Sequence, residues 1–224
     1  MEENTEESSV KEVSIKVSHK ERVEVNQLKW FFIIFGTLMF LSFILIWISI
    51  ESKSFNFSGI GFTKERFGQI DFYTTTITGY GIREVPINYK LNLRNDPREL
   101  DVPVIGEINF LEDGKVYFAL NLSSNISQCG SPISLVNFGH FMSGIGFDLV
   151  TAVPDEAQRD IYEKPVANCK AIINHTVLIL TSGNETKIYQ DSENLNCYVI
   201  EFTNCEEKEA LEKFEVETLI SLTN

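Results

Sequence analysis

The stretch that decides the architecture of this chain is Trp30-Phe-Phe-Ile-Ile-Phe-Gly-Thr-Leu-Met-Phe-Leu-Ser-Phe-Ile-Leu-Ile-Trp-Ile-Ser-Ile50, which contains 21 residues and no charge. At about 1.5 Å per residue, a helix of this length reaches about 30 Å, the thickness of a bilayer's hydrocarbon core. Trp30 and Trp47 lie near its ends, where amphipathic rings prefer the membrane interface. The stretch therefore predicts a single transmembrane helix over Trp30 to Ile50, with the lipid bilayer as its partner.

A buried core helix and a cleaved signal peptide are the alternatives to a membrane span. A core helix of this length usually has a polar face, and none is present. The apolar part of a signal peptide spans about 7–15 residues and ends in a small-x-small site. Here the run is longer, 29 residues precede it, and it leaves through Ile-Ser-Ile-Glu-Ser-Lys. We favour a retained signal-anchor.

Positive charge near the helix predicts its orientation. Within about 20 residues of the helix, five Lys or Arg side chains lie on the N-terminal side and three (Lys53, Lys64 and Arg66) on the other. This bias places the N-terminus in the cytoplasm of a single-pass cell-membrane protein. The C-terminal domain is then expected outside.

Acceptor sequences for N-glycosylation support the same orientation. The pattern Asn-x-Ser/Thr occurs five times and always after the helix. An extracellular glycoprotein domain is therefore expected, with candidate sites at Asn56, Asn121, Asn125, Asn174 and Asn184.

The four cysteines also follow the helix. In an extracytoplasmic domain, four cysteines predict two disulfides, for which three connectivities exist. A zinc site is the alternative, but zinc ligands favour closely spaced pairs, and the nearest pair, Cys197 and Cys205, is eight residues apart. We favour Cys129–Cys169 and Cys197–Cys205 among the possible pairings.

Charge and composition divide the chain into three regions. Residues 1–29 hold five basic and seven acidic side chains without a sustained apolar period, which predicts a disordered cytoplasmic tail. The transmembrane helix occupies 30–50. Residues 51–224 hold the remaining 14 basic and 25 acidic side chains. A domain this acidic repels phosphate, so nucleic acid is excluded as a partner.

Strand patterns dominate the first part of the 51–224 domain. Alternation over Val85 to Leu93 is typical of a half-buried strand, and Arg-Asn-Asp-Pro-Arg at 94–98 ends it. Ile108 to Leu111 and Val116 to Leu122 flank Glu-Asp-Gly-Lys, which predicts a hairpin. Further strands are expected at Gly59 to Phe62, Asp71 to Thr78, Phe147 to Val153, Ala171 to Thr181, Thr186 to Tyr189 and Tyr198 to Phe202.

Helical signals lie in the second part of the domain. Ser134 to Ile145 has helical spacing, and a shorter helix is expected after Pro154. The C-terminal segment after Thr203 has the spacing of a helix, although its alternation also permits a final strand. The sequence therefore predicts an α+β fold, with a possible subdivision into a β-rich part (51–127) and a mixed part (128–224).

No motif in the sequence identifies a reaction, a cofactor or a metal. The only nucleophilic arrangement worth naming is His140 with Ser143 or Cys129, oriented by Asp148, and only proximity in sequence supports it. The paired glycines never extend to a phosphate-binding Gly-x-Gly-x-x-Gly. Carboxylate pairs for glycoside hydrolysis cannot be selected among so many acidic residues.

The chain nevertheless resembles a group of known proteins. Leu93-Arg-Asn-Asp-Pro-Arg98, Cys169, Asn196-Cys-Tyr-Val-Ile200 and Cys205, together with the N-terminal anchor, are similar to uncharacterised single-pass membrane-anchored surface proteins of small-genome archaea. The resemblance covers most of the domain after the helix. It implies an extracytoplasmic domain and assigns no function to any residue.

Three functions remain open at this point. The first is a non-enzymatic surface protein, which binds another envelope protein or a glycan or forms part of a membrane complex. The alternative is an extracytoplasmic hydrolase that uses His140 or a carboxylate pair. A signal-transducing sensor is the third, but the 29-residue tail contains no recognisable cytoplasmic domain.

Overall fold

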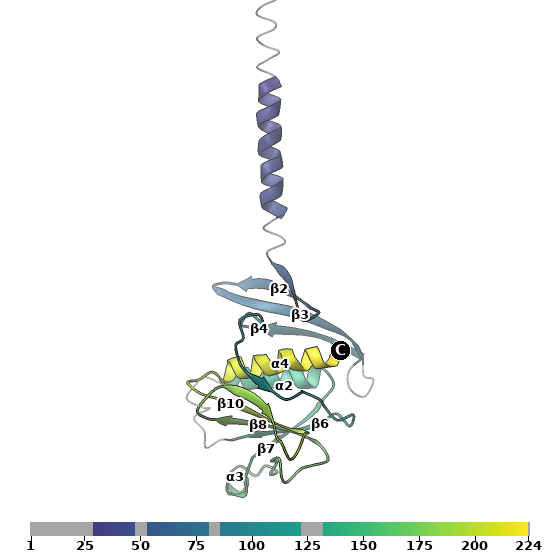
Figure 1. Cartoon of the computed structure of the whole chain (residues 1–224), viewed down its shortest axis with the longest axis vertical. Coiled ribbons are helices and arrows are strands. Elements are labelled where there is room, and N and C mark those ends of the chain that lie inside the picture. The colour runs from purple at the N-terminus through teal and green to yellow at the C-terminus, as the bar shows by residue number, and fades with distance from the viewer. Residues whose placement is uncertain (1–28, 48–52, 81–85, 122–131, 224) are drawn as a thin grey trace, which may run out of the picture. The chain divides into compact units, whose positions relative to one another are not determined.

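The computed structural model describes residues 29–47, 53–80, 86–121 and 132–223. It divides into two compact units, Met1–Lys53 and Ser54–Asn224. The first contains the helix Lys29–Trp47, which is long and apolar enough to cross a membrane (Figure 1). Residues 48–50, the predicted end of the transmembrane segment, lie outside the described residues.

The helix Lys29–Trp47 presents only exposed side chains. Its two hydroxyls are hydrogen-bonded within the helix, since Thr37 donates to the Ile33 carbonyl at 2.6 Å and Ser42 to the Met39 carbonyl at 2.8 Å. Internal pairing of this kind is what an apolar solvent requires of a polar group. The helix thus suits a lipid environment in both its surface and its hydrogen bonding.

The second unit begins with a four-stranded antiparallel sheet, which we call sheet A. Its strands follow chain order as β1 (Ser54–Phe57), β2 (Ile60–Phe67), β3 (Ile70–Tyr80) and β4 (Pro86–Leu93). The predicted alternation of β4 is confirmed, because Ile87, Leu91 and Leu93 are buried while the residues between them are more exposed. One face of sheet A therefore belongs to the core.

A second sheet, sheet B, has six strands. They are β5 (Val104–Ile105), β6 (Lys115–Leu120), β7 (Asp148–Ala152), β8 (Thr176–Ser182), β9 (Lys187–Gln190) and β10 (Cys197–Phe202), in the order β5-β9-β10-β8-β6-β7. All neighbouring strands are parallel except β9 and β10. Parallel neighbours need crossover connections, and these bring helices onto the sheet.

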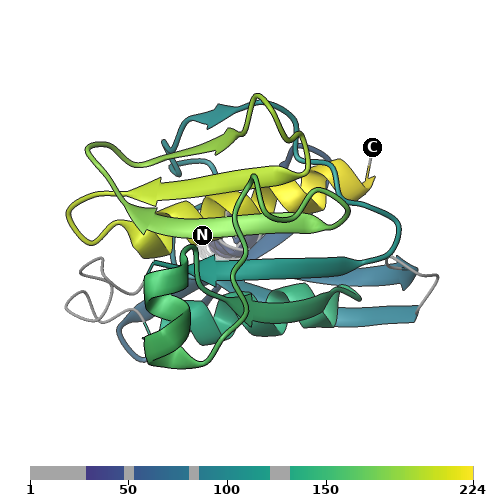
Figure 2. The same ribbon diagram turned by 90° about the horizontal axis from the view of Figure 1, so that it is seen from below.

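Three helices complete the described part of the unit, and the α+β fold class is confirmed. Helices α2 (Pro132–Gly144) and α4 (Glu207–Thr223) lie between the two sheets (Figure 1). Helix α3 (Glu156–Tyr162) lies on the opposite face of sheet B, in front of the strands in Figure 2. The Asp155 carboxylate caps α3 by accepting from the Gln158 backbone N–H at 2.8 Å.

A continuous hydrophobic core joins the three layers. It includes Phe62 and Leu91 of sheet A, Phe138 of α2, Phe214 of α4 and Ile200 of sheet B. Because α4 contacts this core on two sides, nine of its residues are buried, far more than on a one-sided surface helix. A smaller cluster that includes Ala119, Ala152 and Val177 covers the other face of sheet B.

The predicted hairpin around Glu-Asp-Gly-Lys is wrong. Strand β6 pairs in parallel with β7 and β8, and 108–111 form no strand. This segment instead lies against β10, where the Tyr198 hydroxyl donates to the Asn109 carbonyl at 2.7 Å and accepts from its N–H at 2.8 Å. Residues on both faces of β6 are buried, as in a central strand of a parallel sheet.

The favoured disulfide pairing is also wrong. Cys169 bonds Cys197, with their Cα atoms 5.3 Å apart. Cys205 is disulfide-bonded as well, and Cys129 lies outside the described residues. The error has a topological cause: β10 lies parallel to β8, so Cys197 at its start is adjacent to the segment that leads into β8. Proximity in sequence does not reveal this arrangement.

Candidate binding cavity

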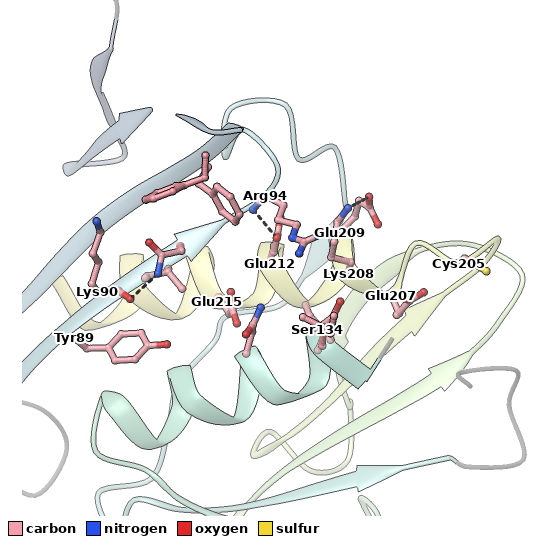
Figure 3. A pocket seen from close by; sticks show the side chains of 17 residues that line it. Tyr89, Lys90, Arg94, Ser134, Cys205, Glu207, Lys208, Glu209, Glu212 and Glu215 are labelled. Atoms are coloured by element: carbon pink, nitrogen blue, oxygen red, sulfur yellow. Dashed lines mark hydrogen bonds and ion pairs between the residues drawn. The ribbon is translucent and has the colours of Figure 1, made fainter. Parts of the chain in front are cut away.

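A cavity of about 730 Å³ lies beside strand β4, next to helices α2 and α4 (Figure 3). Its volume is within the range of about 300–1,000 Å³ that is typical of ligand sites. Four consecutive β4 residues, Tyr89, Lys90, Leu91 and Asn92, line it. Successive side chains of a strand point to opposite faces, so consecutive residues share a cavity only at the strand's edge. The cavity therefore runs along the outer edge of β4.

Helix α4 supplies acidic side chains to the cavity because the helix is covered on two sides. Glu207, Glu212 and Glu215 line the cavity and are at most 8% exposed. In Figure 3, Glu215 lies between Tyr89 of β4 and Ser134 of α2. Buried carboxyls are costly unless paired or neutral, so the partners of each one decide its role.

Glu212 is fully engaged in holding the turn that follows β4. Its Oε1 accepts from the Arg94 N–H at 2.8 Å, and its Oε2 accepts from the Asn95 N–H at 3.0 Å and the Asn95 side-chain amide at 2.8 Å. Burial raises the pKa of Glu212, and these three donors oppose that effect. Glu212 is a structural link between sheet A and α4.

Glu215 is different, because it makes no hydrogen bond or ion pair with any residue that the structure describes. It is 4% exposed. Burial, and then the nearby Glu212 charge, hold the pKa of Glu215 well above its ordinary value of 4.5. Burial and then the Glu215 charge also raise the pKa of Tyr89. Glu215 is thus a buried acceptor that lines a cavity and lacks a donor among the residues described.

Glu207 adds a second such group in the first turn of α4. It is 2% exposed, and its Oε2 has no hydrogen-bond partner among the described residues. The N-terminus of a helix favours a nearby negative charge. Two buried acceptors therefore line the same cavity without donors from the described part of the chain.

The mouth of the cavity is apolar. Phe67 is 68% exposed and Ile133 is 60% exposed, and both line the cavity with Phe72. The Arg94 guanidinium lies over the Phe72 ring at 5.9 Å from its centroid. A ligand of the cavity meets apolar surface at the rim and carboxyl groups inside.

The histidine site considered from the sequence is not assembled among the described residues. His140 is exposed on α2, makes no hydrogen bond or ion pair to a described residue and does not line this cavity. Ser143 and Asp148 are also exposed. His175 instead pairs with the Asp113 carboxylate. Within the described part of the chain, no group of three or more His, Cys, Asp or Glu is placed to hold a metal ion.

The candidate glycosylation sites differ in accessibility. The Asn56, Asn174 and Asn184 side chains are exposed. Asn121 is partly buried, where its amide donates to the Thr181 hydroxyl at 3.1 Å and accepts from the Gln158 amide at 3.1 Å. Asn125 lies outside the described residues. The folded domain therefore presents three of these asparagines to solvent.

Comparison with known proteins adds no further information on the site. No protein-family model, curated protein or solved structure matches this chain. The cavity's role must therefore be argued from its own chemistry.

Sequence reasoning missed the three buried glutamates. All three lie in Glu-Lys-Glu-Ala-Leu-Glu-Lys-Phe-Glu-Val (207–216), which has the composition of an ordinary exposed helix. Their burial follows from the packing of α4 between two sheets. No local pattern in the sequence indicates that arrangement.

Proposed function

We propose that this chain is a membrane-anchored extracytoplasmic binding protein whose ligand site is the cavity beside β4. In this proposal the helix Lys29–Trp47 spans the cell membrane, the N-terminal tail is cytoplasmic and the domain from Ser54 onward is outside. The excess of Lys and Arg before the helix supports this orientation. The Cys169–Cys197 disulfide supports it independently, since such bonds persist in oxidising compartments.

The observation that supports a binding role most directly is Glu215, a buried acceptor in a sizeable cavity. A buried polar atom without a partner costs about 1–3 kcal/mol, and Glu207 Oε2 is such an atom in the same cavity among the described residues. A ligand that donates to Glu207 and Glu215 removes this cost and gives Glu215 a donor. The cavity should therefore favour a ligand that carries a hydrogen-bond donor.

Site-specific photo-cross-linking in cells tests the proposal. A photoreactive residue replaces Asn92 or Ser134 at the cavity, and Ile161 on α3 serves as the exposed control. We expect adducts of the same mass from both cavity positions and none from Ile161, as measured by intact-protein mass spectrometry. Adducts that form equally at all three positions, or at none, would refute the proposal.

The proposed topology has a separate test. Trypsin added to intact cells should degrade the domain after the helix and leave an N-terminal tag on the tail protected. Digestion of the tag with protection of the domain would show the opposite orientation.

Glycosylation has its own test. A shift in mass after glycosidase treatment would show whether Asn56, Asn174 and Asn184 bear glycans, with their Asn→Gln variants as controls.

A hydrolase using a carboxylate pair is the alternative function. The raised pKa of Glu215 favours it, since a neutral carboxylic acid can serve as a general acid. The second carboxylate is the weakness, because both oxygens of Glu212 already accept hydrogen bonds from residues 94 and 95. Glu207 lies eight residues from Glu215, about 12 Å along α4, which is too far for such a pair. Binding is therefore the better-supported role.

A further inference from the structure

The direction of the backbone groups of β4 follows from the turn between β2 and β3. Phe67 and Ile70 are paired across the two residues Gly68 and Gln69, and Gly68 has φ 64°, as the first position of a type II′ turn requires. The residues that close such a turn exchange hydrogen bonds. Even-numbered residues of β3 therefore direct their N–H and C=O groups toward β2, and odd-numbered ones toward β4.

The pairing of β3 with β4 continues this alternation without a break. Thr75 is opposite Leu91 and Tyr73 is opposite Leu93, so these pairs exchange the hydrogen bonds. Lys90 and Asn92 then direct their N–H and C=O groups away from β3. Strand β4 ends sheet A, and no described strand pairs with this outer edge. The outer-edge groups of Lys90 and Asn92, which pair with no described strand, face the cavity that both residues line.

A side-chain contact agrees with this assignment. The Asn92 amide donates to the Lys90 carbonyl at 3.4 Å, at the long limit for a hydrogen bond. Such a bond is a weak substitute for a strand partner. The N–H groups of an added strand would replace it with better geometry.

We propose that the cavity binds an extended segment of a partner protein, which pairs with the outer edge of β4 as a fifth strand of sheet A and directs a Lys or Arg side chain toward Glu215. This inference rests on the proposed function and specifies its ligand. Edge groups two residues apart repeat at about 6.6–6.8 Å, the spacing of a polypeptide backbone in a strand. A glycan does not present donors and acceptors with that repeat.

Charge complementarity predicts which type of peptide side chain enters the cavity. Glu215 and Glu207 are buried residues that line the cavity, and neither Glu215 nor Glu207 Oε2 has a donor among the described residues. Lys or Arg provides several donors with a positive charge. The exposed Phe67 ring and the half-buried Phe72 ring at the mouth fit apolar residues of the same segment. The predicted ligand is an alternating peptide with one basic side chain facing inward.

A peptide selection on the full chain in lipid nanodiscs tests this proposal. The probe is a library of acetylated, amidated hexapeptides. Alternate positions contain Val, Thr, Tyr or Phe, and the others contain Lys, Arg, Glu, Gln or Leu. Peptides retained by the protein are identified by mass spectrometry against empty nanodiscs. We expect Lys or Arg to be enriched at one position, and Glu at that position to be depleted.

Two variant pairs separate the backbone and charge contributions. Asn92→Pro removes an outer-edge N–H, whereas Asn92→Thr keeps it. Only the proline variant should therefore bind the selected peptides with an affinity lower by tenfold or more. Glu215→Gln should lower the affinity for basic peptides by a similar factor. Glu217→Gln, at a residue that pairs with Lys213 outside the cavity, should not.

If Asn92→Pro fails to fold, a modified peptide tests the same backbone pairing on the unaltered protein. Methylating alternate backbone nitrogens of a selected peptide should abolish binding in one register and spare it in the other. An absence of retained peptides, or peptides insensitive both to methylation and to Glu215→Gln, would overturn the inference. Cross-links from Asn92 to a ligand that is not a polypeptide would overturn it too, while leaving the proposed function standing.

Discussion

The Glu212 carboxylate accepts a hydrogen bond from the backbone N–H of Arg94 at 2.8 Å, across 118 residues of sequence. With two further bonds from Asn95, it fixes the end of β4 against α4. The acidic cavity begins beside this contact, since Arg94 and Glu212 both line it. One side chain therefore holds the turn after β4 against α4, while the apolar residues of β4 pack in the core.

Replacing Glu212 with Ala should destabilise the domain by about 2–4 kcal/mol, because it leaves three donors near the core without their acceptor. Glu212→Gln keeps one carbonyl oxygen and should cost less. Chemical denaturation of the full chain in detergent, followed by near-ultraviolet circular dichroism, measures both. Equal loss in the two variants would mean that the hydrogen bonds to 94 and 95 contribute little.

Glu215 should make stability depend on pH in a specific direction. Its folded-state pKa is raised, so above the ordinary value of 4.5 the unfolded chain releases a proton that the folded state retains. The free energy of unfolding should therefore fall as pH rises from about 4.5 toward the folded-state pKa.

The Glu215→Gln variant removes that dependence. Its Tm should exceed that of the wild type most clearly at pH 8, with the difference shrinking toward pH 4. Glu217→Gln on the same helix, where Lys213 is paired, is the control. A difference between Glu215→Gln and wild type that does not change with pH would show that Glu215 does not titrate as its environment implies.

Gly144 at the end of α2 should be intolerant of a side chain. A Cβ there would lie 2.3 Å from Cδ2 and 2.9 Å from Cγ of Tyr89, so the whole ring must move. We expect Gly144→Ala to cost about 1–3 kcal/mol despite the better helix propensity of Ala. In a Tyr89→Ala background the penalty should disappear, and a double-mutant cycle in thermal unfolding measures this. A penalty that persists would locate the strain elsewhere.

The Cys169–Cys197 bond should contribute strongly to stability. It closes a separation of 28 residues, for which loop entropy predicts about 3–4 kcal/mol. The Cys169→Ala/Cys197→Ala double variant should lose that amount in denaturation. Non-reducing peptide mapping should recover these two cysteines in one linked species, and a Cys129–Cys169 species would contradict the pairing.

Sequence periodicity predicted the helices and strands whose own residues follow one consistent apolar pattern. The apolar helix Lys29–Trp47, strand β4 and helix α2 each have one consistent pattern, and each forms close to its expected position. For residues after Thr203, where helix and strand patterns coexisted, the structure has a helix. Strand β8 begins at Thr176, five residues later than the apolar run that predicted it.

What the sequence did not predict depends on contacts between distant segments. The parallel position of β6, the pairing of Cys169 with Cys197 and the burial of Glu215 all require knowledge of which strands are neighbours. A turn signal such as Glu-Asp-Gly-Lys specifies a change of direction and not a partner. The candidate site consists entirely of such contacts, so it was not visible in the sequence.

The position of α4 between the sheets has a consequence for biosynthesis. Its buried residues Leu211, Phe214 and Leu219 belong to the core that joins both sheets, yet every strand that the structure describes precedes them in the chain. Sheets A and B should therefore leave the ribosome with apolar faces that α2 covers only in part, until Glu207–Thr223 emerges. The domain cannot mature strand by strand, and its core closes only when this helix docks.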